Sequence, residues 1–192
     1  MLSAFVPDDG RGLGPVDVDA AHFVFATFLG LIWCRVRQCV RAASGRKRYN
    51  VLGALDCVSH QLIGVSNHSY INAESVCLLL RALADAATGM PLTLVLDNAR
   101  YQKCALVTDL AKQLGIELLY LPSYSPNLNL IERVWKFVKA ECLRSKYYAS
   151  YEEFTTAIQQ SLDDLPTKHK AAMDSLLTHN FQTFENVSLV AA

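Results

Sequence analysis

The chain has 192 residues, of which 52% are hydrophobic and 19% are charged, and it contains only six prolines and nine glycines. This composition is typical of a folded globular protein and excludes a disordered or low-complexity chain. Basic and acidic residues both number 18, so the formal net charge is zero and does not by itself indicate a nucleic-acid partner. The length suits one domain with a substantial core.

Cysteine usage and hydropathy indicate the cellular compartment of the protein and whether it associates with a membrane. Six cysteines are scattered without a CxxC pair or zinc-finger spacing, and no signal peptide precedes them, so we expect a reduced, cytoplasmic protein. The longest uncharged run, residues 20–34, is shorter than the roughly 20 residues that a membrane helix needs. We therefore expect no membrane association and interpret this run as part of a buried β-hairpin.

The first third of the chain reads as strands. Residues 1–15 are punctuated by glycine and proline, so we expect a loose leader before a fold that begins near Val16. Four segments rich in β-branched and aromatic residues follow, and a polar turn over residues 44–48 precedes the third. An antiparallel meander is predicted over residues 16–28, 30–42, 49–59 and 61–67.

The pattern then changes to alternating helices and strands. Apolar residues recur at helical spacing between Asn72 and Ala87, and short apolar strands over 92–97 and 116–122 flank a helix over 99–115. Strand, helix and strand predict a parallel pair with a right-handed crossover. Three more helices are predicted at about 129–144, 151–164 and 168–178. The order predicts an α/β fold with a mixed sheet flanked by helices, and a ribonuclease H-like arrangement fits it.

Asp97 follows a short apolar strand and precedes Asn98 and Arg100. It therefore projects from the carboxyl end of a central strand, where open α/β sheets place ligand sites. Asn98 and Arg100 are candidates for orienting ligands or phosphates. The structural alternative is that Asp97 caps the following helix.

Glu132 lies on the predicted helix over 129–144, away from the side that the apolar residues bury. At about 100° per residue it shares one face with Lys136 and Lys139, which would place a metal-binding carboxylate beside two phosphate-binding ammonium groups. The structural alternatives are a capping box with Asn129 and an i,i+4 pair with Lys136.

A third carboxylate has several possible sources. Asp17 and Asp19 point to the same face of the first strand, where a buried carboxylate is costly unless it is paired or binds a metal. Asp56 is another candidate, although its place in LDCVSH is typical of a turn at a strand end. His22, next to this face, is expected to be a core histidine.

Basic residues are concentrated in one part of the chain. Six of the 18 lie in a 14-residue window, which predicts a phosphate-contacting patch or, alternatively, a solvated hairpin face. These residues are Arg35, Arg37, Arg41, Arg46, Lys47 and Arg48.

Five blocks stand out when the segments are taken together: DAAHFV, SGRKRYNVLGALD, VLDNARYQKC, LYLPSYSPNLNLIERVWKFVKAECL and SLLTHNFQTFEN. They resemble the DDE-superfamily endonuclease domain of bacterial insertion-sequence transposases, in the branch related to mariner elements. The 34 residues between Asp97 and Glu132 are the interval typical of that group. The family's first aspartate precedes its Ala-x-His-Phe block, which corresponds to Asp19 here, while Asp17 stands where the family has an apolar residue.

The resemblance implies a ribonuclease H-like catalytic domain over residues 16–186, followed by a tail over 187–192. It implies that Asp19, Asp97 and Glu132 hold two Mg²⁺ or Mn²⁺ ions, with Asp19 bridging them, for hydrolysis at transposon ends and strand transfer into target DNA. The expected contacts to double-stranded DNA are Arg46, Lys47, Arg48, Arg100, Lys136 and Lys139.

The resemblance also predicts partners. We expect a homodimer in the DNA complex. Related transposases carry a helix-turn-helix domain upstream, for which the residues before Val16 leave no room. A separate helix-turn-helix polypeptide, a frameshift product or a truncated gene copy would each explain this.

Two other functions fit the same residues. One is a truncated transposase remnant that binds DNA or dimerises without catalysis, and the other is a nuclease of the same fold acting on a Holliday junction or an RNA–DNA hybrid. The acids do not distinguish these functions, whereas the YSPNLNLIE block favours the transposase.

Overall fold

The computed structural model describes residues 2–3, 15–25, 35–36, 47–87, 91–122 and 129–178. Arg46 and most of the predicted strand over 30–42 lie outside these ranges. The elements, in chain order, are β1 Leu2–Ser3, β2 Val16–Val24, β3 Arg48–Asp56, β4 Leu62–Asn67, α1 Ala73–Ala87, β5 Leu92–Leu96, the 3₁₀ helix η1 Arg100–Gln102, α2 Ala105–Gln113, β6 Ile116–Tyr120, α3 Ile131–Leu143, α4 Tyr151–Asp163 and α5 Lys170–Leu176.

The strands form one sheet in the order β1–β4–β3–β2–β5–β6. β2 pairs antiparallel with β3, and β3 pairs antiparallel with β4. β5 lies parallel to both β2 and β6, and parallel neighbours need a crossover such as the one that contains α2. The mixed sheet predicted from the sequence is therefore confirmed.

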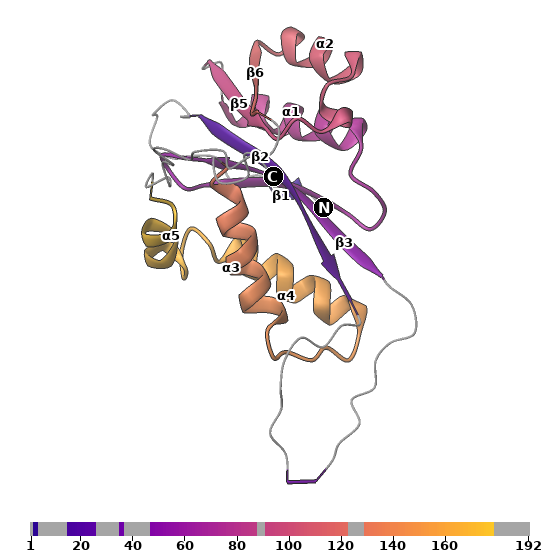
Figure 1. The fold of residues 1–192 in the computed structure, drawn as a ribbon, viewed down its shortest axis with the longest axis vertical. Helices are drawn as coiled ribbons and strands as arrows, with labels where there is room; N and C mark the ends of the chain where they lie inside the picture. The colour runs from indigo at the N-terminus through magenta and orange to yellow at the C-terminus, as the bar shows by residue number, and fades with distance from the viewer. Residues whose placement is uncertain are drawn as a thin grey trace, which may run out of the picture.

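Helices cover both faces of the sheet (Figure 1). α1 packs on β3 and β4, whereas α3 lies against β2 and β3 on the other face, with α4 and α5 beside it. Side chains alternate along β2, so Val18 belongs to the core under α1 and Phe23 to the core under α3. By the same alternation Asp17 and Asp19 both point toward α3, as predicted.

α1 forms where the apolar spacing predicted it, because Val76, Leu79, Leu80 and Leu83 are all buried against the sheet. Asn72 precedes the helix and its Oδ1 accepts the backbone N–H of Ser75 at 3.0 Å, which satisfies one of the free donors of the first turn. Within the described ranges, no helix is both long enough and apolar enough to cross a bilayer.

The single helix predicted over 99–115 is wrong, because this segment is divided into η1 and α2. The buried Gln102 side chain accepts the N–H of Ala99 at 3.1 Å, and Asp97 also accepts it at 3.3 Å. Such local side-chain contacts satisfy the backbone in a tight turn and compete with a continuous helix. α2 then begins at Ala105 and is anchored to the core by the fully buried Val107.

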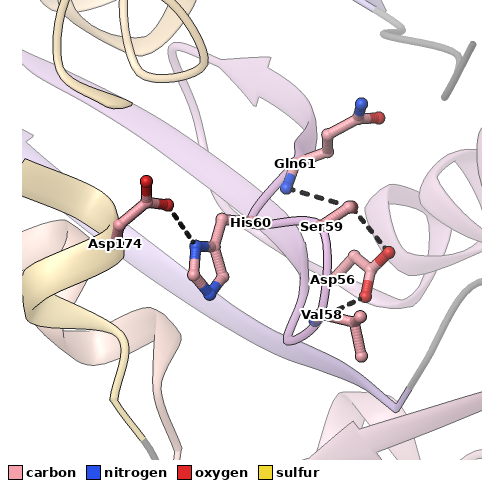
Figure 2. A network of polar contacts seen from close by, with 6 residues as sticks. All are labelled: Asp56, Val58, Ser59, His60, Gln61 and Asp174. Carbon is pink, nitrogen blue, oxygen red and sulfur yellow. Dashed lines mark hydrogen bonds and ion pairs between the residues drawn. The ribbon is translucent and has the colours of Figure 1, made fainter. Parts of the chain in front are cut away.

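Asp56 holds the turn between β3 and β4 (Figure 2). Its Oδ1 accepts the N–H of Val58 at 2.9 Å and its Oδ2 accepts the hydroxyl of Ser59 at 2.6 Å. His60 in the same turn has a φ of 59° and meets Asp174 of α5 at 3.1 Å. Asp56 therefore has the strand-end role that its sequence context predicted.

Candidate metal centre

The pairing of β2 with β5 brings two of the predicted acids together. Val18 lies opposite Leu96 in the parallel register. The next residues on the two chains, Asp19 and Asp97, therefore leave adjacent strands that lie about 4.8 Å apart. Asp97 is exposed and Asp19 is partly buried. This is the carboxyl end of β5, where ligand sites of open α/β sheets lie.

The first turn of α3 is attached to the same strand. The Oδ2 atom of Asp17 accepts the N–H of Leu130 at 2.7 Å, and Asn129 Nδ2 donates to the carbonyl of Val18 at 3.5 Å. These contacts involve Asp17 and Val18, the two residues that precede Asp19 on β2. They fix the helix turn that carries Glu132 over the part of β2 that carries Asp19.

Asp17 consequently serves the fold. It is 4% exposed, and its carboxylate sits at a helix start, where free N–H groups and the helix dipole favour negative charge. Burial and the charge of Asp17 raise the pKa of the neighbouring Cys57 thiol to about 12. Asp19 is left as the β2 carboxylate that faces Asp97 and Glu132.

The structural alternatives for the other two acids are not realised. Asn129 accepts the N–H of Ile131 at 3.3 Å, so it does not form the predicted capping box with Glu132. The ion pairs among the described residues do not include one between Glu132 and Lys136. Asp97 caps no α-helix, since the residue at the N-cap of α2 is Cys104.

The carboxylates interact electrostatically. Burial, followed by the negative charges of Asp97 and Glu132, raises the pKa of Asp19 from 3.8 to about 6. The groups that lower this pKa are neutral donors, the backbone N–H of Ala20 and the indole of Trp135. The centre therefore concentrates negative charge that a divalent cation would neutralise.

The three carboxylates are hard oxygen ligands of the kind that Mg²⁺ prefers. Among the described residues, however, no group of three or more His, Cys, Asp or Glu side chains is arranged so that it could hold a metal ion. The electrostatic coupling of Asp19 with Asp97 and Glu132 acts over a longer range than ligation and marks a looser grouping. Mg²⁺ suits such a grouping, because it keeps several waters and is completed by substrate phosphates.

Asn98 adds an uncharged oxygen beside this centre. Its backbone is left-handed, with a φ of 79°, and its Oδ1 is buried with no hydrogen-bond partner. An unpaired buried acceptor is costly, and strained backbone of this kind is concentrated at functional sites. The amide oxygen is therefore a further donor that a cation or its water could use.

The centre is bordered by two aromatic residues, and sequence reasoning identified neither of them. Trp135 is 4% exposed, and its Nε1 makes no hydrogen bond of standard geometry, although the indole lies close enough to lower the pKa of Asp19. Burial and the charges of Asp97 and Asp19 raise the pKa of Tyr101 to about 12, so its phenol stays protonated at neutral pH. The sequence signal that could have identified them is their spacing, since Trp135 lies three residues after Glu132 and Tyr101 lies four residues after Asp97.

The predicted DNA contacts lie on the surface around the centre. Lys136 and Lys139 are exposed on α3, as their spacing predicted, and Arg100 is exposed at the start of η1. Lys47 and Arg48 are exposed at the start of β3. Arg46 lies outside the described residues, so its placement stays a prediction.

The prediction for His22 is wrong. This side chain is exposed, and its Nδ1 lies 2.7 Å from Asn50 Oδ1. It is three positions from Asp19 along β2, so it points to the opposite face of the strand. The apolar residues on both sides of His22 in the sequence suggested that it is buried. At this end of β2, however, the face to which His22 points is exposed.

Comparison with known proteins places the chain in a family. Residues 35–155, more than half of its length, match the family described as DDE superfamily endonuclease. No curated protein matches the sequence significantly.

Several solved structures share the fold. The Mos1 mariner paired end complex with Mn is 17% identical with a TM-score of 0.57, covering 88% of this chain and 56% of that chain. The Mos1 transposase complex with the left transposon end is 17% identical with a TM-score of 0.55, covering 87% and 56%. The catalytic core domain of BIV integrase is 17% identical with a TM-score of 0.54, covering 85% and 96%.

The extent of these matches defines what is shared. The chain spans about 56% of the Mos1 chains and nearly all of the integrase core domain. The shared fold is the mixed sheet with flanking helices found in transposase and integrase cores, which confirms the predicted ribonuclease H-like class. With a family match over more than half of its residues, the chain belongs to the DDE superfamily endonucleases.

Proposed function

We propose that this chain is the catalytic core of a DNA transposase, which hydrolyses phosphodiester bonds at transposon ends and transfers the freed 3′ ends into target DNA. One observation carries the proposal: Asp19, Asp97 and Glu132 come from β2, the end of β5 and the first turn of α3, and the charges of the other two raise the pKa of Asp19. Membership of the endonuclease family and the likeness to Mos1 complexes support it.

Asp19, Asp97 and Glu132 would hold two Mg²⁺ or Mn²⁺ ions. Mos1 structures described as complexes with Mn or with Mg support the choice of metal. Bound ions of this kind supply activation of the attacking oxygen and stabilisation of the leaving oxygen.

The chemistry needs no covalent bond between protein and DNA. In hydrolysis, the oxygen of water bonds to phosphorus, the bond from phosphorus to the 3′ oxygen breaks, and that oxygen takes up a proton to give a 3′-hydroxyl. In strand transfer, this hydroxyl loses its proton, bonds to a target phosphorus and displaces the target's 3′ oxygen. Tyr101, whose pKa is raised by burial and by the charges of Asp97 and Asp19, stays protonated at neutral pH and would be a hydrogen-bond donor in this reaction.

DNA would be held through its phosphates by the basic residues around the centre. The proposed contacts are Arg46, Lys47, Arg48, Arg100, Lys136 and Lys139. The active assembly would be a homodimer on DNA, joined by a separate helix-turn-helix polypeptide that recognises the terminal repeats. We place the chain in the cytoplasm of a bacterium, as the product of an insertion sequence, with its catalytic domain over residues 16–186.

A nicking and strand-transfer assay tests the proposal. The chain is fused to a DNA-binding domain of known specificity, and the terminal repeats that flank its gene are placed beside that domain's site. We expect cleavage and joining with Mg²⁺ or Mn²⁺, abolished by Asp97→Asn and by Glu132→Gln. Asp109→Asn, which removes an exposed carboxylate of α2, is the matched control and should keep activity. A folded wild-type fusion that cuts no DNA would contradict the proposal and favour a non-catalytic remnant.

A further inference from the structure

A cleft of about 540 Å³ lies at the far end of the β2–β3 pair from Asp56. It combines cations with aromatic rings, and none of the described side chains that line it is acidic. The lining residues are Lys47, Arg48, His68, Ser69, Tyr70 and Tyr151. Positive charge beside aromatic rings is the combination by which proteins bind single-stranded nucleic acid, with phosphates on the cations and bases on the rings.

One wall of the cleft is a fixed turn. The side chain of Asn50, 1% exposed, donates to the carbonyl of Ser69 at 2.8 Å and to Asn67 Oδ1 at 3.0 Å. Asn67 in turn accepts the N–H of Ser69 at 3.1 Å and donates to the carbonyl of Tyr70 at 2.9 Å. Burying a polar amide is costly unless its bonds are satisfied, and here three of these bonds involve the backbone of Ser69 or Tyr70 and fix the turn that presents Tyr70.

The aromatic residues of the cleft differ in how they are used. Tyr151 donates its hydroxyl to the carbonyl of Arg48 at 2.6 Å and meets His68 Nδ1 at 2.8 Å, so both rings are held by the protein. Tyr70 is 76% exposed. A large exposed ring on a rigid turn has a free face on which another flat group can stack.

The cleft and the candidate metal centre lie on the same pair of strands, β2 and β3. Lys139 Nζ on α3 lies 5.8 Å from the centre of the Phe23 ring, and Lys47 Nζ lies 5.4 Å from that of Tyr151. Gly53 pairs with Asp19, and Arg48 lies five residues earlier on β3. At 3.3 Å per residue this places the cleft about 16 Å from Asp19, or about five steps along a stacked nucleic-acid strand.

We propose that this cleft binds an unpaired nucleotide of the DNA strand whose phosphodiester lies at the metal centre, with the base stacked on Tyr70 and the neighbouring phosphates contacted by Lys47 and Arg48. The base must be unpaired, because a duplex buries the base faces that Tyr70 would need. The proposal rests on the proposed function for the identity of the DNA, although binding in the cleft requires neither metal nor cleavage.

Fluorescence anisotropy in EDTA tests it with three labelled DNAs of equal length: a blunt duplex, a duplex with a short 3′ overhang and a single strand. The overhang DNA is expected to bind the full chain about 10-fold more tightly than the blunt duplex. Tyr70→Ala should remove this preference, and Tyr70→Phe, which keeps the ring, should retain it. Lys47→Gln with Arg48→Gln should weaken binding to all three DNAs and flatten its salt dependence.

Two controls separate this proposal from the proposed function. Lys112→Gln and Asp109→Asn, which change exposed residues of α2, should both leave binding in EDTA unchanged. Equal affinity for blunt and overhang DNA, or an overhang preference that is retained in Tyr70→Ala, would overturn the proposal that the cleft binds an unpaired nucleotide. If Tyr70→Ala loses the overhang preference but the wild-type chain cuts no DNA, nucleotide binding in the cleft is supported. The absence of cleavage then counts against the catalytic proposal alone.

Discussion

Trp135 packs so closely on Gly53 that a Cβ atom at position 53 would lie 2.7 and 2.8 Å from the ring carbons Cη2 and Cζ2. Gly53 is the residue of β3 that pairs with Asp19. The absence of a side chain at position 53 therefore lets the indole lie beside the carboxylate at the centre of the proposed metal site. Glycine is required there for close approach, as at other strand positions where a neighbouring group comes near the backbone.

Replacing this glycine should affect both stability and the site. Gly53→Ala forces Trp135 to move, and overpacking of this kind costs about 1–3 kcal/mol of unfolding free energy. We expect that loss in urea denaturation, together with weaker Mn²⁺ binding. Gly64→Ala is the matched control, because a Cβ there would meet its nearest atoms at 3.5 Å, an ordinary contact. Equal stability of the two variants would show that the packing on Gly53 is not tight.

The raised pKa of Asp19 predicts that the metal-free protein becomes less stable as the pH rises. Folding raises its pKa from 3.8 to about 6, so the unfolded chain binds fewer protons in that interval and the unfolding free energy falls as the pH rises through it. Asp19→Asn should therefore stabilise the protein by about 2 kcal/mol at neutral pH and have little effect near pH 4. Urea denaturation in EDTA at both pH values measures this. If Asp19→Asn destabilises the protein at neutral pH, burial and the charges of Asp97 and Glu132 do not make an ionised Asp19 unfavourable.

Asp17 should behave in the opposite way, although it lies only two residues away. Asp17→Asn weakens the 2.7 Å charge-assisted bond to the N–H of Leu130, and we expect a loss of about 1–3 kcal/mol at neutral pH. The same denaturation experiment compares the two variants directly. If both variants shift stability in the same direction, the division of roles between Asp17 and Asp19 is wrong.

The lysines of α3 should act on DNA through charge alone. Each phosphate contact contributes about 0.9 to the slope of log affinity against log salt, so Lys136→Gln with Lys139→Gln should flatten that slope by about 2. Anisotropy titrations over a range of salt concentrations measure it, with Lys112→Gln on α2 as the control. An unchanged slope would indicate that this face of α3 does not contact the DNA.

Much of the fold followed from short-range patterns. The helical spacing of Val76, Leu79 and Leu83 gave α1, and the apolar run before Asp97 gave β5, because burial on one face constrains each local sequence. The division of the 99–115 segment was missed, because it depends on the buried side chain of Gln102, which apolar periodicity does not report.

The candidate site was predictable only in part. Spacing and resemblance paired Asp97 with Glu132, but alternation along β2 could not separate Asp17 from Asp19, since both point to the same face. The resemblance indicated Asp19, and the hydrogen bond from Leu130 to Asp17, which joins residues 113 positions apart, favours the same choice. Trp135 looked like an ordinary apolar helix residue, and its place beside Asp19 depends on Gly53 in a different strand.

The most direct test of the account is a calorimetric titration of the metal-free chain with Mn²⁺ at neutral pH, since it measures the metal centre without requiring DNA or cleavage. We predict saturable binding by the wild type and by Asp109→Asn, and loss of that binding in Asp97→Asn and in Glu132→Gln. Binding by both of these variants with wild-type affinity, or no binding by the folded wild type, would contradict a metal centre formed by Asp19, Asp97 and Glu132.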